Sequence, residues 1–284
     1  MADLLLKNHA PDRHGLVHRV TPESAGWGHV GFELYRLKAG QSLAAATAER
    51  EACLVLVGGK ARVQAGGRDF AEPDFGEVGE RMGPFEGKKP VAVYVPWHSD
   101  YRIEATTDLE LGVCSAPGGG DHGARVIGPD QVAYSVRGQG SNTRHVYDIL
   151  PETEPAHSLL VVEVITPAGG WSSYPSHKHD TDDLPYESEL QETYYHRLDP
   201  PQGFAFQRVY TDDGSLDETM CVHDGDVTMV PKGYHPCGTA HGYQLYYLNV
   251  MAGPKRIWRF NTEPCHRWLL DPAKASARSA PQSS

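Results

Sequence analysis

Two histidines separated by one residue, His177 and His179, are the side chains in this sequence with the clearest chemical potential. In an extended strand, residues two apart point to the same face, so the pair can offer two imidazoles to one metal ion. A chain with 15 His in 284 residues holds roughly one such pair by chance, so the pair alone is weak evidence. Whether the pair belongs to a metal site therefore depends on the surrounding residues.

Further nitrogen and oxygen donors follow the histidine pair. Glu192 opens the polar and aromatic segment ETYYHR, and His235 follows a Pro-Lys-Gly turn at the end of a short strand-like run, 226–230. Three histidines and one glutamate form an N₃O set that suits Zn²⁺, Mn²⁺, Fe²⁺, Co²⁺ or Ni²⁺. Because Glu187 and Glu189 stand nearer to the pair in sequence, the residues by themselves leave the carboxylate ligand open among three glutamates.

The charge balance bounds the partners of such a site. A formal net charge of −11 argues against nucleic acid, because phosphate binding relies on clustered Lys and Arg. An anionic small molecule is repelled at long range, so its site must supply a local cation. Arg208 is the first candidate, because its neighbours on the same face of the segment GFAFQRVYT are aromatic and a guanidinium fork suits a carboxylate.

Other polar side chains are further candidates for contact with a substrate. Two cations and two tyrosines are candidates for its carboxylate and hydroxyl groups: Lys232, Arg144, Tyr234 and Tyr247. Tyrosines in barrels belong more often to the core than to a site. The candidates for a catalytic base are Lys232, His241 and Glu218.

Length and composition bound the class of protein. At 284 residues the chain is long enough for two domains, and a hydrophobic content of 39% suffices for packed cores. No apolar run approaches the roughly 20 residues that span a bilayer, so we expect a soluble protein without a membrane partner. Five cysteines, without a C-x-x-C pair, argue against a disulfide framework and favour the reducing cytoplasm.

The elements that must position these residues are short β-strands. Segments such as ACLVLVGG, PVAVYVP, LLVVEVIT and YQLYYLNVMAG alternate with Gly- and Pro-rich turns, and no long stripe of 3.6-residue period interrupts them. This pattern predicts an all-β chain of two barrels in tandem. We expect an N-terminal barrel over 1–125, a crossover over 126–158 partly packed on the second barrel, a C-terminal barrel over 159–270 and a disordered tail over 271–284.

The two halves differ in their potential ligands. The first half has no H-x-H pair, and Glu49 and Glu51 are the only candidate ligands in the corresponding region, although His98 follows a strand-to-turn element much as His235 does. We therefore interpret the first barrel as degenerate and metal-free, with packing and dimer formation as its role. The chemistry is expected in the second barrel.

The chain resembles known families at two levels. The histidine pair, the glutamate, and then Gly225, Pro231, Gly233 and His235 resemble the two-part metal motif of the cupin β-barrels. Longer strings, among them GERMGPFEGKKPVAVYVP, RGQGSNTRHVYDILPE, PPQGFAFQRVYTDD and YYLNVMAGPKRIWRF, resemble the 5-deoxy-glucuronate isomerases of myo-inositol catabolism. That family is related to the uronate ketol-isomerases, which are also double cupins, and the similarity covers nearly all of the chain except the tail.

The resemblance implies a fold, a ligand set and a reaction. It implies two jelly-roll barrels, with one divalent transition metal per chain, Zn²⁺ first, bound by His177, His179, Glu192 and His235. The implied reaction converts 5-deoxy-D-glucuronate, a small anionic sugar acid, to 5-dehydro-2-deoxy-D-gluconate by aldose–ketose isomerisation, in a homo-oligomer. The alternatives are a cupin dioxygenase with iron on the same ligands, and a non-catalytic sugar-binding cupin.

Overall fold

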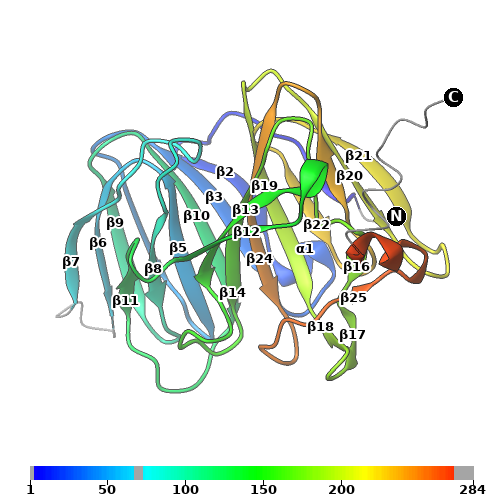
Figure 1. The fold of residues 1–284 in the computed structure, drawn as a ribbon. Helices are drawn as coiled ribbons and strands as arrows, with labels where there is room; N and C mark the ends of the chain where they lie inside the picture. Colours follow the sequence, from blue (N-terminus) through cyan, green and yellow to red (C-terminus); the bar gives the residue numbers. More distant parts are fainter. Residues whose placement is uncertain (1–2, 67–72, 272–284) are drawn as a thin grey trace, which may run out of the picture.

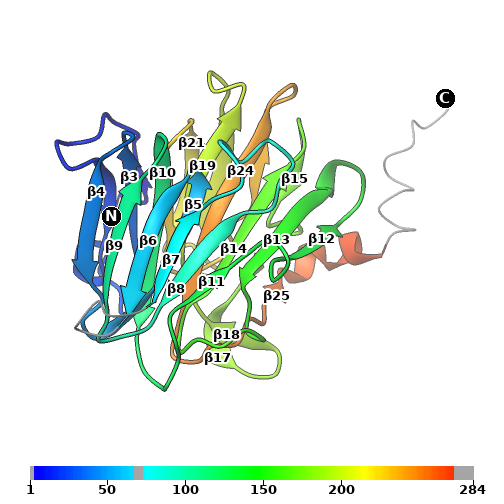
Figure 2. The ribbon, with the colours of Figure 1, turned by 90° about the vertical axis from the view of Figure 1, so that its left-hand side faces the viewer.

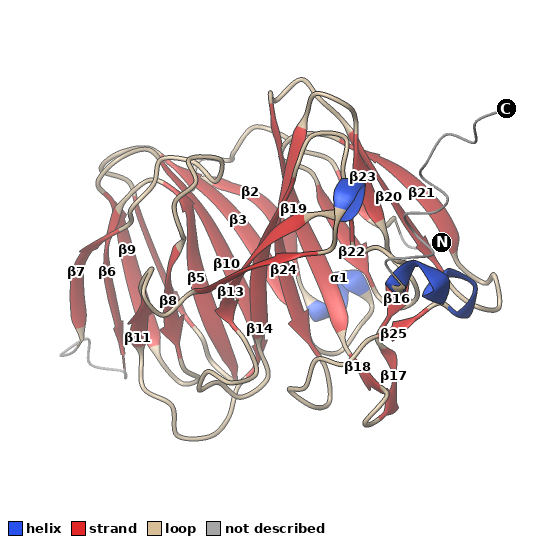
Figure 3. Cartoon of the chain, viewed as in Figure 1, coloured by secondary structure: helices blue, strands red, loops and turns tan. Residues whose placement is uncertain are grey.

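The chain forms two β-barrels that lie side by side, as Figure 1 shows, in a computed structural model that describes residues 3–66 and 73–271. Figure 3 shows that strands and loops make up almost all of it, which confirms the predicted all-β class. The predicted disordered tail lies outside the described residues, apart from Asp271. No helix among the described residues is long and apolar enough to cross a membrane.

The first barrel is built from two antiparallel sheets. Figure 2 shows the smaller of them as the outer layer that faces the viewer. The six-stranded sheet has the order β11 (Arg125–Ile127), β8 (Val91–Val95), β5 (Arg50–Gly58), β10 (Leu109–Pro117), β3 (Gly31–Leu37) and β2 (Leu16–Val20). The four-stranded sheet has the order β4 (Ser42–Ala46), β9 (Asp100–Ala105), β6 (Ala61–Gly66) and β7 (Asp74–Val78).

The second barrel has the same plan with a larger main sheet. Its seven strands have the order β1 (Leu5–Leu6), β22 (Val227–Val230), β19 (Gln191–Asp199), β24 (Gln244–Ala252), β14 (Leu160–Thr166), β13 (Arg144–Leu150) and β12 (Ala133–Arg137). The facing sheet has the order β15 (Trp171–Ser172), β23 (Cys237–Thr239), β20 (Ala205–Tyr210) and β21 (Asp217–Val222).

A few short elements complete the fold. Two strand pairs lie at one end of the second barrel: β16 (His177–Lys178) with β25 (Asn261–Thr262), and β17 (Asp180–Asp183) with β18 (Glu187–Glu189). The described helical turns are α1 (Pro22–Ala25) and the 3₁₀ turns η1 (Gly140–Asn142) and η2 (Pro264–Leu270).

The two large sheets pack face to face, and this explains the unbroken apolar runs of the sequence. In β5, Cys53, Val55 and Val57 belong to the core between the barrels, whereas Leu54 and Leu56 belong to the core inside the first barrel. A strand buried on both faces has no solvent side, so apolar and polar residues do not alternate along it. The buried apolar residues inside the second barrel form a third core.

Sheet pairing crosses the predicted domain limits at several points. β1, from the start of the chain, pairs with β22 of the second barrel, and β11, at the predicted 125/126 limit, pairs with β8 of the first. Within the predicted crossover, β12 and β13 extend the seven-stranded sheet through β14.

A buried ion pair joins the two barrels. The guanidinium of Arg81, in the loop before β8, donates to both carboxylate oxygens of Glu163 on β14 at 2.7 Å. Both side chains are almost fully buried, at 1% and 0% exposure, and the Tyr246 hydroxyl donates a further hydrogen bond to Glu163. Each charge is therefore compensated by a partner from the other barrel.

Glu51, a candidate ligand in the sequence of the first barrel, has a different environment. Its buried carboxylate accepts hydrogen bonds from the Tyr94 hydroxyl and from the backbone N–H groups of His157, Ser158 and Leu159, at 2.6 to 2.8 Å. These contacts attach the end of the crossover to the first barrel. Glu51 therefore has a full set of protein donors.

Candidate metal centre

The four predicted ligand residues come from three parts of the second barrel. His177 and His179 lie on β16 and just after it, Glu192 lies on β19, and His235 lies in the segment between β22 and β23. That segment turns at Gly233, whose φ of +89° is left-handed and where a Cβ would collide with a neighbouring backbone carbonyl. The turn directs His235 into the barrel.

Three of these side chains, His179, Glu192 and His235, have ligand atoms within 4.8 Å of one another, and His177 lies beside that group without belonging to it. Glu192 approaches both neighbouring rings, with Oε1 2.7 Å from Nε2 of His179 and Oε2 3.5 Å from Nε2 of His235. The ring of His177 lies with its centroid 5.1 Å from that of His235 and 6.4 Å from that of His179. All four residues are buried.

The hydrogen bonds of the three histidines leave their Nε2 atoms available. Nδ1 of His177 faces the carbonyl oxygen of residue 175 at 3.2 Å, Nδ1 of His179 faces that of residue 190 at 3.2 Å, and Nδ1 of His235 faces that of residue 233 at 2.9 Å. A carbonyl can only accept, so each Nδ1 carries a proton and donates. This is the tautomer in which Nε2 presents its lone pair to a metal.

Unsatisfied polar atoms test whether the residues fit a metal ion. Among the described residues, Nε2 of His179, Nε2 of His235 and Oε2 of Glu192 are buried and make no hydrogen bond. Buried polar atoms rarely lack a partner, and a cation bound between these three atoms would satisfy them together. The donor set of imidazole nitrogens and a carboxylate oxygen suits a divalent transition metal.

The electrostatics differ between the histidines of the site. Burial, reinforced by the neighbouring histidines, lowers the pKa of His177 well below its usual value, so its ring stays neutral as a ligand must be. Burial would also lower the pKa of His179, but the facing Glu192 carboxylate raises it. Metal binding at Nε2 of His179 would therefore displace a proton that the carboxylate favours.

The other two glutamates that the sequence left open lie elsewhere. Glu187 is buried in β18 and accepts from the Lys178 ammonium at 2.9 Å and from the backbone N–H groups of residues 180 and 181. Glu189 is at the end of the same short strand, opposite Asp180. Of the three glutamates, only Glu192 joins the histidine cluster.

A second group of potential ligand atoms lies close by on the surface. Glu263, Cys265 and His266, in and just before η2, have ligand atoms within 4.8 Å of one another. Glu263 is already the acceptor of a 2.5 Å hydrogen bond from the Tyr210 hydroxyl, and Cys265 is exposed. Among the described residues, no such group lies in the first barrel.

A pocket inside the second barrel opens onto the histidine cluster. The inner face of the seven-stranded sheet supplies most of its walls, and two aromatic side chains from the segment after β24 complete them. Its lining residues are Arg137, Arg144, Val146, Val162, Val164, Ser173, His177, Glu192, Tyr194, Tyr247, Asn249, Trp258 and Phe260.

Arg144 gives this pocket a positive charge that no protein carboxylate balances. Its guanidinium donates to the backbone oxygen of Asn142 at 3.0 Å and to the side-chain oxygen at 3.3 Å, and it forms no ion pair among the described residues. The second arginine of the pocket, Arg137, is bound to Asp148 at 3.0 and 3.3 Å. The pocket thus contains a metal-type cluster and an uncompensated cation.

Of the predicted substrate contacts, Arg144 and Tyr247 line the pocket and Arg208 does not. Arg208 lies on the outer face of β20, because Ala205, Gln207 and Val209 point inward. It forms a two-point ion pair with Asp217 at 2.8 Å and packs over the Tyr210 ring at 3.9 Å. The aromatic face of GFAFQRVYT is thus the outside of the barrel.

The remaining predicted candidates lie outside the pocket lining. Lys232 and His241 are exposed in turns, and Glu218 is half-buried on β21. Tyr234 is buried and donates its hydroxyl proton to Asp212 at 2.9 Å. The structure therefore brings none of the three base candidates to the histidine cluster.

Several pocket residues were not predicted from the sequence. Tyr194 could have been found, because it stands two residues after Glu192 on the same face of one strand; its hydroxyl lies 3.2 Å from that of Ser173. Arg137 pairs with Arg144 across β12 and β13, a register that no pattern in the sequence specifies. Trp258 and Phe260 follow the last barrel strand and carry no distinctive spacing.

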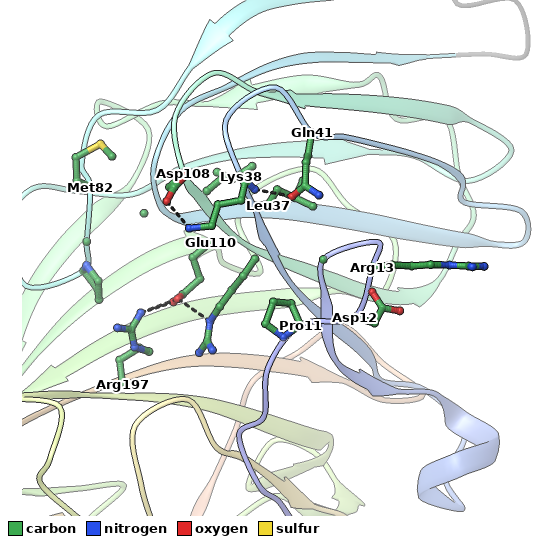
Figure 4. A pocket seen from close by; sticks show the side chains of 16 residues that line it. Pro11, Asp12, Arg13, Leu37, Lys38, Gln41, Met82, Asp108, Glu110 and Arg197 are labelled. Atoms are coloured by element: carbon green, nitrogen blue, oxygen red, sulfur yellow. Dashed lines mark hydrogen bonds and ion pairs between the residues drawn. The ribbon is translucent and has the colours of Figure 1, made fainter.

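A larger cavity, of about 650 Å³, lies between the barrels, and Figure 4 shows its lining. Five of its charged side chains are paired with one another: Glu110 binds Arg197 at 2.6 and 2.7 Å and Arg36 at 3.4 Å, and Lys38 binds Asp108 at 2.8 Å. We therefore place the chemistry in the smaller pocket, where the charge of Arg144 is free.

Comparisons with known proteins agree with this fold. An IolB-like protein of known structure from Salmonella typhimurium LT2 is 51% identical, with a TM-score of 0.91 over 95% of this chain and 100% of that one. A mutant of oxalate decarboxylase from Bacillus subtilis is only 14% identical but superposes with a TM-score of 0.64 over 98% of this chain and 84% of that one. The second comparison concerns the fold alone, and the predicted double-cupin architecture is confirmed.

Curated relatives carry the name of an enzyme. Proteins named 5-deoxy-glucuronate isomerase are 53% identical in Geobacillus kaustophilus, over 95% of this chain and 96% of the relative, and 46% identical in Bacillus subtilis strain 168, over 90% and 93%. The expectation of an aldose–ketose isomerase is therefore confirmed at the level of enzyme class. The model of the KduI/IolB family matches residues 4–269, and with these relatives it shows that the chain belongs to that family.

Proposed function

We propose that this chain converts 5-deoxy-D-glucuronate to 5-dehydro-2-deoxy-D-gluconate in myo-inositol catabolism, with one divalent transition metal held by His177, His179, Glu192 and His235. The observation that carries the proposal is the pocket, which is lined by His177 and Glu192 of this ligand set and by Arg144. His179 and His235 have ligand atoms within 4.8 Å of Glu192. A sugar acid has a carbonyl at one end, which would face the metal ligands, and a carboxylate at the other, which would face Arg144. The names of the curated relatives support the same substrate.

The residues of the pocket have separate tasks in this reaction. The bound metal would act as a Lewis acid toward the aldehyde and the neighbouring hydroxyl, which makes the C2 proton easier to remove. Arg144 binds the carboxylate and fixes which end of the substrate reaches the histidines. Trp258 and Phe260 form an apolar wall that limits the access of water.

Proton transfer from C2 to C1 depends on groups that line the pocket. Apart from the proposed metal ligands, the lining side chains that have a hydroxyl group are Ser173, Tyr194 and Tyr247. Burial, together with the nearby Glu192 charge, raises the pKa of Tyr194 well above its usual value. Its hydroxyl therefore stays protonated near neutrality and serves as a hydrogen-bond donor to a substrate oxygen.

One experiment separates this function from a cupin dioxygenase and from a non-catalytic sugar-binding cupin. The protein is stripped of metal, reconstituted with Zn²⁺ without oxygen, and supplied with 5-deoxy-D-glucuronate while ketone formation and solvent deuterium uptake are followed. An isomerase needs no redox-active ion, so ketone should form. Activity only with Fe²⁺ and O₂ together would identify a dioxygenase, and saturable binding of the acid without any product would identify a binding protein.

We also propose that the enzyme acts as a homo-oligomer in the cytoplasm. The outer face of the sheet β15-β23-β20-β21 exposes Trp171, Phe204 and Phe206, and a second copy could cover them. All five cysteines are free, in keeping with a reducing compartment. Light scattering of the wild type and of Phe206→Ser would test the assembly, since a monomeric wild type contradicts it.

A further inference from the structure

The register of the seven-stranded sheet arranges the pocket-facing side chains in levels along the strands. On the inner face, residues two apart on one strand belong to successive levels, and paired residues on neighbouring strands share a level. From the cation to the metal cluster, the levels are Arg137–Arg144, then Val146–Val164–Tyr247, then Val162–Asn249–Tyr194, then Met251–Glu192. Except for Met251, all of these side chains line the pocket.

This order fixes what each part of a bound sugar acid would meet. With its carboxylate at Arg144 and its carbonyl end at the level of Glu192, the chain of carbons runs across the two middle levels. The carbon next to the carboxylate meets the first of them, where Val146 and Val164 are directly paired. Hydroxyl-bearing carbons further along meet the level that offers Asn249 and Tyr194.

The two valines of this level offer nothing for a substrate hydroxyl to bond with. Both valines are buried, at 2% and 5% exposure, and neither side chain can donate or accept. Two further residues share that level: Tyr247, whose hydroxyl is bonded to the Ser172 hydroxyl of the facing sheet at 2.6 Å, and His196, which does not line the pocket. A substrate hydroxyl placed there would lose its bonds to water without replacement, which is costly in a buried site.

We propose that Val146 and Val164 select substrates whose carbon next to the carboxylate is a methylene rather than a carbinol. The inference rests on the proposed function, since it takes the substrate to be a six-carbon uronic acid held at Arg144. It adds that these two valines distinguish a 5-deoxy uronate from the ordinary 5-hydroxy uronates.

The test measures binding separately from turnover. The C1 aldehyde of 5-deoxy-D-glucuronate and of D-glucuronate is reduced to a primary alcohol, so that neither analogue can close a hemiacetal ring or react. Dissociation constants for both analogues are then measured with the metal-loaded wild type and with Val146→Thr and Val164→Thr, which add a hydroxyl at nearly constant shape. Val209→Thr is the matched control, because Val209 is buried in the same barrel core but does not line the pocket.

The expected wild-type preference for the 5-deoxy analogue is roughly 10- to 100-fold, the usual effect of one unpaired buried hydroxyl. Each pocket variant should lower that preference about tenfold, and Val209→Thr should leave it unchanged while lowering thermal stability. A wild type without preference, or pocket variants that keep the full preference, would overturn the inference. If the preference behaves as expected but the wild type does not isomerise 5-deoxy-D-glucuronate, the valine assignment stands and the proposed function fails.

Discussion

Replacement of Arg144 by glutamine tests the arrangement of the whole pocket, because this residue is proposed to hold the end of the substrate opposite the metal. The guanidinium is bonded only to oxygens of Asn142 and forms no ion pair among the described residues. It is therefore free to form a charge-assisted pair with a substrate carboxylate, which contributes about 1.5–3 kcal/mol. Arg144→Gln should then lower kcat/KM roughly 10- to 150-fold.

Arg208→Gln is the matched control for that experiment. Arg208 is also an arginine of the second barrel, but it is half-exposed and paired with Asp217, so its loss should change kcat/KM less than about twofold. Initial rates with 5-deoxy-D-glucuronate, and with its C6 amide as a neutral analogue, provide the assay. The amide should remove most of the difference between Arg144→Gln and the wild type.

Two results would refute the reasoning. If Arg144→Gln loses as much activity toward the amide as toward the acid, the residue does not act through the substrate charge. If Arg208→Gln is as damaging as Arg144→Gln, the carboxylate is held at the surface of β20 and not in the pocket.

Three further predictions concern the metal, the barrel interface and pH. The wild type should bind one equivalent of divalent transition metal and the His177→Ala/His179→Ala variant none; stoichiometric metal in the variant by elemental analysis would contradict the site. Arg81→Met leaves Glu163 buried without its cation and should cost about 3–5 kcal/mol of unfolding free energy in urea titrations, much of it recovered in Arg81→Met/Glu163→Leu; a single variant within about 1 kcal/mol of wild type would contradict this. Burial lowers the pKa of His196 to about 4 in the folded protein. Its pKa in the unfolded chain is about 6.5, so between these two values the unfolded chain binds a proton that the folded protein does not. As the pH falls from 7 to 5, this difference should lower the free energy of unfolding by about 2 kcal/mol. The His196→Gln variant should lose that part of the pH dependence. If the urea midpoints at pH 7 and pH 5 differ as much in the variant as in the wild type, His196 is not the source of the pH dependence.

The sequence predicted the fold class well because its signals are local. Apolar runs such as ACLVLVGG, broken by Gly and Pro, predict short buried strands, and their lack of alternation has its cause in the packing of one barrel on the other. That packing is not local, so the sequence did not indicate that Arg81 and Glu163 would meet, or that β1 would join the second barrel.

The candidate site was predictable in part, for the same reason. Histidines two apart predict a shared face, and the turn that follows predicts His235 as a partner, but the residues alone did not choose among Glu187, Glu189 and Glu192. Arg208 was misplaced because period-two alternation separates the two faces of β20 but does not say which face is inside. In the structure the polar Gln207 points inward, where Thr228 donates to its amide oxygen at 2.5 Å. Arg137 meets Arg144 only through the register of a hairpin.

The pairing of β1 with β22 ties the second barrel to the beginning of the chain. Leu5 and Leu6 lie opposite Thr228 and Val227, and the next residue, Lys7, binds Asp226 at 3.0 Å. During synthesis this first strand has to wait until its partner, more than two hundred residues later, leaves the ribosome. A fragment of the second barrel produced without residues 5–6 would expose the edge of β22, the strand that pairs with β19 at Glu192.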